Sequence, residues 1–116
     1  QGRLLRFASA IYRLTVPYQK ELFLEPTIRQ ILKSSTSVGA NYSEAQSSSS
    51  YKDFLNKVKI AQKELKETEY WIKFLKDIKN GGDSFTEMES EIDQLLRIFT
   101  TIAKKADLRL KTQAKK

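Results

Sequence analysis

The chain has 116 residues, with 21 Lys or Arg against 14 Asp or Glu, no His, no Cys and a net charge of +7 at pH 7. This length suits one domain with a sizeable core, and the scarcity of glycine (4) and proline (2) argues against a turn-rich all-β fold. The absence of Cys excludes disulfides and thiolate metal sites. The basic charge indicates either polyanionic partners or, equally, lysine-rich helices that are simply well solvated.

The first predicted helix covers about residues 3–15, with its arginines on the side away from the core. Its apolar stripe consists of Leu4, Ala8, Ile11 and Thr15. Pro17 should end this helix, because proline lacks an N–H donor and disfavours helical geometry in the residue before it. The segment 17–25 is then a packed loop or a short helical turn.

Pro26 suits the first position of a second helix over about residues 27–46, since its missing N–H would be unpaired there. The inward stripe consists of Ile28, Ile31, Ser35, Val38, Tyr42 and Ala45. Small residues crowd the middle of this helix: Ser34, Ser35, Ser37, Gly39 and Ala40. Because serine and glycine are mediocre helix formers, they indicate either close approach by a neighbouring helix or a loop.

The longest regular pattern predicts a third helix over about residues 50–79, after a polar connection of serines. From Phe54 onward, a heptad seam runs through Val58, Ala61, Leu65, Thr68, Ile72 and Leu75. Ser50 with Asp53 forms a capping signal at its start. The pairs Asp53–Lys57 and Glu69–Lys73 have the spacing of stabilising ion pairs.

Asn80-Gly81-Gly82 is the clearest break, and the segment 84–87 reads Ser-Phe-Thr-Glu, a capping box for a fourth helix over about 84–112. Its apolar stripe consists of Phe85, Met88, Ile92, Leu95, Phe99, Ile102, Ala106 and Leu110. Acidic residues gather at its start and basic residues at its end, which matches the helix dipole. Four amphipathic helices with short connections predict one all-α domain over residues 1–116, an antiparallel up-down-up-down four-helix bundle.

The sequence lacks the residues that most catalytic and metal sites need. Without His, a catalytic triad and the di-iron site of ferritin-like bundles are impossible. Glu64 and Glu67 are interpreted as solvated surface, and the spacing of Lys33 and Ser37 as chance rather than a nucleophile pair. We expect no enzyme activity, no cofactor and no metal.

A resemblance to a known family lies in the second and third helices. The run from Gln30 to Ala45, with the core Ser-Val-Gly-Ala-Asn-Tyr-Ser-Glu-Ala, is similar to the signature of the bacterial four-helix bundle family that includes proteins encoded by intervening sequences in 23S ribosomal RNA genes. Segments 51–54, 60–61, 67–69 and 12–24 add to it. The chain departs from the family at Ala45, where many members have Gly, and at Lys63-Glu64, which replace a small Gly-Ser pair.

The resemblance implies ring-like homopentamers with basic surfaces, in a family that carries a historical label as ribosomal proteins and whose molecular role is not settled. A related accessory protein of diversity-generating retroelements binds nucleic acid and a reverse transcriptase. Within the signature, Ser37, Asn41 and Glu44 are interpreted as a structural motif. One helical turn separates Asn41 from Glu44, and these two could bond a neighbouring helix or the backbone.

Two functions from different classes follow. The first is a non-enzymatic, homo-oligomeric scaffold that binds RNA or DNA electrostatically with little sequence specificity. Its candidate contacts are Lys104, Lys105, Arg109, Lys111, Lys115 and Lys116, followed by Arg3, Arg6 and Arg13. The alternative is a protein–protein assembly module in which Tyr70, Trp71 or Phe74 anchors a partner or sister subunit. One contiguous basic face would favour the first, and evenly mixed charge the second.

No apolar run approaches the roughly 20 residues that a membrane-spanning helix needs. We expect no signal peptide, although a start at Gln1 also fits a processed or trimmed N-terminus. No helix combines a strongly basic face with an unpartnered apolar one. We therefore expect a cytoplasmic protein that binds no membrane.

Overall fold

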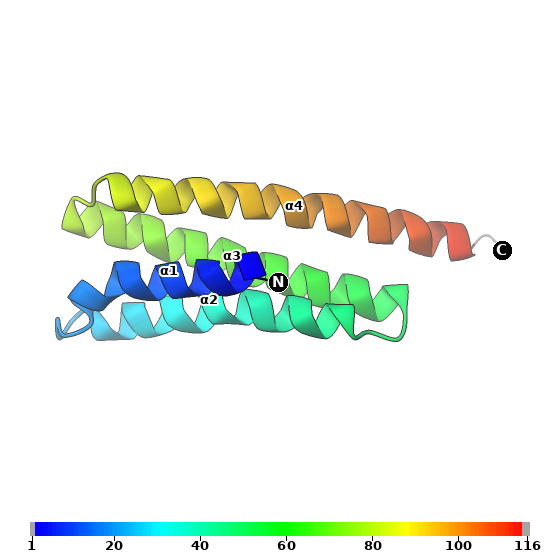
Figure 1. The fold of residues 1–116 in the computed structure, drawn as a ribbon, viewed down its shortest axis with the longest axis horizontal. Helices are drawn as coiled ribbons and strands as arrows, with labels where there is room; N and C mark the ends of the chain where they lie inside the picture. The colour runs from blue at the N-terminus through cyan, green and yellow to red at the C-terminus, as the bar shows by residue number, and fades with distance from the viewer. Residues whose placement is uncertain (1, 115–116) are drawn as a thin grey trace.

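The computed structural model describes residues 2–114, which form four α-helices and a short 3₁₀ turn. In chain order these are α1 (Gly2–Thr15), η1 (Val16–Tyr18), α2 (Glu25–Gln46), α3 (Tyr51–Lys79) and α4 (Asp83–Ala114). Successive helices run in opposite directions along one long axis, in a molecule of 56 × 22 × 21 Å (Figure 1). The predicted all-α, up-down-up-down four-helix bundle is therefore confirmed.

The connection between α1 and α2 forms where Pro17 and Pro26 indicated a break in the helices. α1 ends at Thr15, and the chain continues through η1, which contains Pro17. α2 begins at Glu25, two residues before its predicted start, so Pro26 lies in the first turn rather than at the first position. The earlier start sacrifices no hydrogen bond, because N–H groups of the first turn have no partner within the helix.

The two predicted N-terminal caps have different outcomes. The cap of α3 is confirmed, because the backbone N–H of Asp53 donates to Ser50 Oγ at 3.1 Å. The capping box predicted over 84–87 is wrong: α4 begins at Asp83, and the carbonyl of Gly82 accepts its first two backbone hydrogen bonds at 3.1 and 3.2 Å. The serine of the predicted box already lies inside the first turn, past the capping position.

The turn between α3 and α4 depends on close packing. Asn80 has a φ of 51°, in the left-handed region, and the N–H of Gly81 donates to the carbonyl of Lys76 at 2.8 Å to close the end of α3. Gly81 has no space for a side chain, since a Cβ there would lie 2.4 Å from the ring of Phe85. Phe85 is buried, so this glycine allows α4 to fold back directly onto α3.

The heptad seam of α3 is fully buried, as predicted. Its members with 0% exposure are Val58, Ala61, Leu65, Thr68, Ile72 and Leu75. α3 packs against both α2 and α4, so it is the central element of the bundle (Figure 1). At the start of the seam Phe54 is only half-buried, while the neighbouring Leu55 is buried instead.

The small residues of α2 lie within a continuous helix, so the loop alternative is wrong. Ser34 and Ser35 are buried, and the hydroxyls of Ser34 and Thr68 share a hydrogen bond of 2.7 Å across the α2–α3 contact. On another side of α2, Gly39 faces the Cβ of Leu4 on α1, which would lie 3.5 Å from a Cβ at position 39. Small side chains therefore admit neighbouring helices at two contacts.

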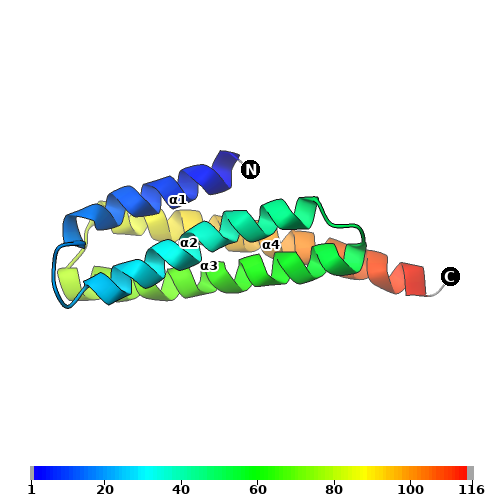
Figure 2. The same cartoon turned by 90° about the horizontal axis from the view of Figure 1, so that it is seen from below.

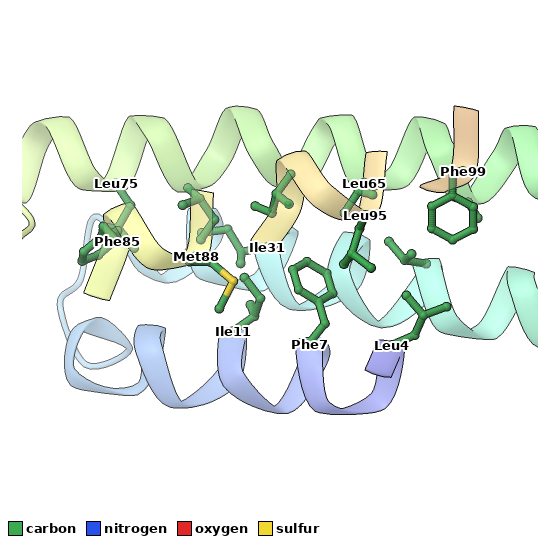
Figure 3. Packing of buried hydrophobic residues seen from close by; sticks show 14 of the residues in the cluster. Leu4, Phe7, Ile11, Ile31, Leu65, Leu75, Phe85, Met88, Leu95 and Phe99 are labelled. Carbon is green, nitrogen blue, oxygen red and sulfur yellow. The ribbon is translucent and has the colours of Figure 1, made fainter. Parts of the chain in front are cut away.

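α1 is much shorter than the other helices and covers only part of the bundle. Its buried residues Leu4, Phe7 and Ile11 point into a core that α2, α3 and α4 also supply (Figure 3). The chain begins about halfway along the long axis, and α1 diverges from its neighbours toward that end (Figures 1 and 2). The last turns of α4 extend past the α2–α3 turn, at the end of the molecule opposite the α3–α4 turn.

A core truncation tests the central position of α3. Leu65→Ala should lower the free energy of unfolding by about 2–5 kcal/mol, because it leaves a cavity where α3 meets its neighbours. Chemical denaturation monitored by circular dichroism measures this loss. Ile60→Ala in the same helix, at a side chain 41% exposed, should change stability by less than about 1 kcal/mol. Equal losses in the two variants would contradict the arrangement.

Candidate nucleic-acid interface

The first candidate cations lie on the second half of α4, whose last turns extend past the α2–α3 turn (Figure 1). Lys104 and Lys105 are exposed, and neither forms an ion pair with another described residue. Lys111 Nζ lies 3.3 Å from the carboxylate of Asp107, one turn earlier on the same helix. The candidates at 115 and 116, both Lys, lie outside the described residues. The end of α4 thus presents positive charge that is only partly neutralised.

Arg109 contacts a residue that the sequence patterns did not indicate. Its Nη1 donates to Tyr51 Oη at 2.8 Å, and its guanidinium carbon lies 5.4 Å from the centre of that ring. Tyr51 is the first residue of α3 and is 58 positions away along the chain. No local sequence pattern could reveal this contact, which joins the end of α4 to the start of α3. Arg109 forms no ion pair with a described residue.

Arg3 forms an ion pair between α1 and α4. Its Nε and Nη2 donate to the two carboxylate oxygens of Glu91 at 3.1 and 2.8 Å, and Nη2 also donates to Gln94 at 3.0 Å. The hydrogen bonds and the charge of Glu91 raise the pKa of Arg3 above its usual value. Arg3 therefore links two helices, and much of its charge is compensated.

Arg6 and Arg13 line a groove of about 880 Å³ between α1 and the beginning of α4. Three acidic residues, Asp83, Glu87 and Glu91, line the same groove. The α1 arginines therefore lie beside the first half of α4, whereas the other candidates lie on its second half (Figure 1). The structure does not bring the described candidates together into one continuous face.

Ion pairs neutralise several of the remaining lysines. Pairs between separate elements are Lys57–Glu44 at 3.0 Å, Lys76–Glu89 at 2.7 Å and Lys79–Glu21 at 2.6 Å. The predicted Asp53–Lys57 pair is wrong, because Lys57 reaches across to α2 instead. The predicted pair within α3, Glu69–Lys73, is confirmed at 3.8 Å.

Acidic residues without a basic partner gather near the α3–α4 turn. Asp77 lies at the end of α3, and Asp83 and Glu87 lie in the first turns of α4, with no ion pair to any described residue. This turn and the protruding end of α4 are at opposite ends of the long axis (Figure 1). Asp77, Asp83 and Glu87 thus lie at one end of the molecule, whereas Lys104 and Lys105 lie toward the other.

The three residues interpreted as a structural motif make helix contacts. Ser37 Oγ donates to the carbonyl of Lys33 at 2.7 Å, and the Asn41 amide donates to the carbonyl of Ser37 at 2.8 Å. Glu44 accepts the ion pair from Lys57 on α3. Only Glu44 thus reaches a neighbouring helix, while Asn41 and Ser37 bond the backbone of their own.

Glu64 and Glu67 are one turn apart on α3 and interact with each other. Partial burial, followed by the charge and hydrogen bonding of Glu67, raises the pKa of Glu64, although Lys63 and Lys33 act in the opposite direction. Ionisation of Glu64 is therefore less favourable in the folded state than in the unfolded chain. The side chain is only half-exposed, so its interpretation as ordinary solvated surface is incomplete.

Two groups of apolar side chains are exposed away from the cations. In the α1–α2 connection, Leu22 is 80% and Phe23 is 90% exposed. On α3, the half-buried Trp71 ring packs edge-on against Tyr70 and Phe74, with ring centres 5.2 and 6.1 Å apart. Trp71 contacts the core, whereas Tyr70 points largely to solvent.

Neither a metal-ligand cluster nor a membrane-spanning helix occurs within residues 2–114. This part of the chain holds no cluster of three metal-ligating side chains. None of its helices is both long and apolar enough to cross a bilayer.

Comparison with known proteins matches the chain to a family and to a solved structure. The family model for the 23S rRNA-intervening sequence protein matches residues 3–101, most of the chain. The chain belongs to this family, so the resemblance found in the sequence is confirmed. The family description names no enzymatic activity.

A solved structure supports the same assignment. It is a protein of unknown function from the S23 ribosomal protein family of Bacteroides thetaiotaomicron VPI-5482, 34% identical to this chain with a TM-score of 0.78. The match covers 89% of this chain and 96% of that one. No curated protein matches the sequence.

The Glu64 carboxyl provides a pH-dependent test. Because its pKa is higher in the folded than in the unfolded chain, its stabilising contribution is present at low pH and is lost as the pH rises through the folded-state pKa. Glu64→Gln should therefore raise the melting temperature at pH 7 and have little effect near pH 3, where carboxyl groups are protonated in both states. Calorimetry at both pH values measures the shift.

Glu87→Gln is the control for this test. Glu87 is exposed in the first turns of α4, where the helix dipole favours a negative charge. Its neutralisation should not raise the melting temperature at pH 7. A rise in both variants would indicate a general effect of net charge rather than the environment of Glu64.

Proposed function

We propose that this protein is a non-enzymatic, cytoplasmic scaffold that binds RNA or DNA through their phosphates, with little sequence preference. The observation that supports the proposal is the uncompensated positive charge on the second half of α4, at Lys104 and Lys105. The net charge of +7 also favours binding to a polyanion. Arg109, held against Tyr51, would add a charged group in a fixed position.

The proposed binding is electrostatic. Lysine and arginine side chains replace counterions condensed on the nucleic acid, so the affinity falls steeply as salt is added. Reading a base sequence would require contacts to base edges or stacking on exposed aromatic rings. The exposed Tyr70 and Phe74 are in the half of α3 nearest the α3–α4 turn, far from Lys104 and Lys105. Tyr51 is exposed near these lysines, but its ring already contacts Arg109, which favours contact with the nucleic-acid backbone alone.

The proposal includes assembly of several copies, in a ring of five by analogy with the family. Each copy would repeat the same cationic surface, so linked weak contacts would together give a higher affinity than one copy has. The exposed Leu22 and Phe23 are suitable for burial in such an assembly.

A protein-interaction module without a nucleic-acid role is the second candidate. The observation in its favour is the same pair of exposed apolar residues, Leu22 and Phe23, together with the edge-on contacts of Trp71 with Tyr70 and Phe74. Aromatic side chains on a surface often anchor a partner protein. This candidate predicts a defined complex whose stability depends little on salt.

Charge reversal on α4 tests the nucleic-acid proposal. Lys104→Glu should weaken binding to RNA and to duplex DNA to the same degree for every sequence, and should lower the salt slope by about one. Fluorescence anisotropy across a salt series measures this, with light scattering to record the mass of the protein alone.

Lys20→Glu is the matched control, because it makes the same change of charge at an exposed position in the α1–α2 connection. It should leave binding nearly unchanged. A wild-type protein that binds neither nucleic acid even at low salt would end the proposal and direct attention to a protein partner.

A further inference from the structure

Basic residues recur every seven positions on two neighbouring helices. On α3 they are Lys52, Lys59, Lys66 and Lys73, and on α4 they are Arg97, Lys104 and Lys111. Lys73 pairs with Glu69, so the α3 row without ion pairs consists of Lys52, Lys59 and Lys66. Seven residues of α-helix advance about 10.5 Å and fall only about 20° short of two full turns. Each set therefore forms a row that runs nearly along its helix, and all of its members are exposed.

Contacts between the helices fix the register of the two rows. Gln62 Nε2 donates to Thr100 Oγ1 at 3.0 Å, and Arg109 donates to Tyr51 at 2.8 Å. In this antiparallel register, each lysine of the α3 row lies level with a basic residue of the α4 row. The resulting layers are Lys52 with Lys111, Lys59 with Lys104, and Lys66 with Arg97.

The rows also lie on the same side of the molecule. Lys59 and Lys66 are three residues before and four after Gln62, while Arg97 and Lys104 have the same spacing around Thr100. Residues three and four apart share a helix face, so these four cations surround the part-buried Gln62–Thr100 hydrogen bond. They therefore flank the outer edge of the α3–α4 contact.

Carboxylates compensate this surface only in part. Asp93 pairs with Arg97 at 3.0 Å and Asp107 pairs with Lys111 at 3.3 Å, both within α4. No described carboxylate forms an ion pair with any lysine of the α3 row or with Lys104. Like charges held together in this way repel one another, and a polyanion laid between them would remove the repulsion.

We infer that this surface, defined by Lys52, Lys59, Lys66, Arg97, Lys104 and Lys111, binds the sugar–phosphate backbone of a nucleic acid along the α3–α4 contact. The inference rests on the proposed function and adds the α3 lysines to the site. The three layers are about 10.5 Å apart, so the surface is roughly 21 Å long and can contact several phosphates of one nucleic acid.

Two triple variants with the same change of net charge test the inference. The surface variant is Lys59→Gln/Lys66→Gln/Lys104→Gln, and the control variant is Lys20→Gln/Arg29→Gln/Lys33→Gln, at exposed cations outside the proposed surface. The probes are fluorescent RNA and DNA duplexes of one sequence and about 20 base pairs, titrated between about 50 and 200 mM salt. Circular dichroism melting confirms that both variants fold.

The surface variant should lower the salt slope by about two to three and weaken binding at least tenfold, while the control variant binds like the wild type. The ratio of the RNA and DNA affinities identifies which backbone is the ligand. Equal losses in both variants, or loss in the control alone, would overturn the inference while the proposed function stands. A wild type that binds neither duplex at low salt would overturn both.

Discussion

The burial of one stripe of α3 is the constraint on which the rest of the structure depends. A helix of 29 residues whose seam is fully buried needs long neighbours on two sides, and α2 and α4 supply them. The hydrophobic effect fixes this face and thereby also fixes which face of α3 remains in water. The α3 lysines at seven-residue spacing lie on that remaining face, so the core and the charged surface are two consequences of a single pattern.

The small residues of α2 solve a packing problem that this central helix creates. Ser34 approaches α3 closely enough for its hydroxyl to bond Thr68, which satisfies two polar groups buried in an apolar core. Gly39 gives α1 similar access on the other side. A run of weak helix formers is stable here because tertiary packing, rather than intrinsic propensity, holds the helix.

The distribution of charge connects the fold to the proposed function. Ion pairs between helices absorb several lysines, and the arginines of α1 either pair with Glu91 or share a groove with acidic residues. Lys52, Lys59 and Lys66 on α3 and Lys104 on α4 form no ion pair with any described residue. Membership of the 23S rRNA-intervening sequence protein family establishes the fold, and its description assigns no chemistry to the chain. The proposed function therefore depends on the arrangement of the cations.

Hydrophobic periodicity in the sequence determined the four helices and the α3 seam, and the capping pattern of Ser50 with Asp53 determined the start of α3. These features depend on residues within one or two turns of each other. The start of α4 was mispredicted, since the Gly82 carbonyl served in place of the serine cap. Only the tertiary structure decided that Lys57 pairs with Glu44, that Arg109 meets Tyr51 and that the α3 and α4 rows share a register. Such contacts join positions far apart in the chain, and helix packing alone brings them together.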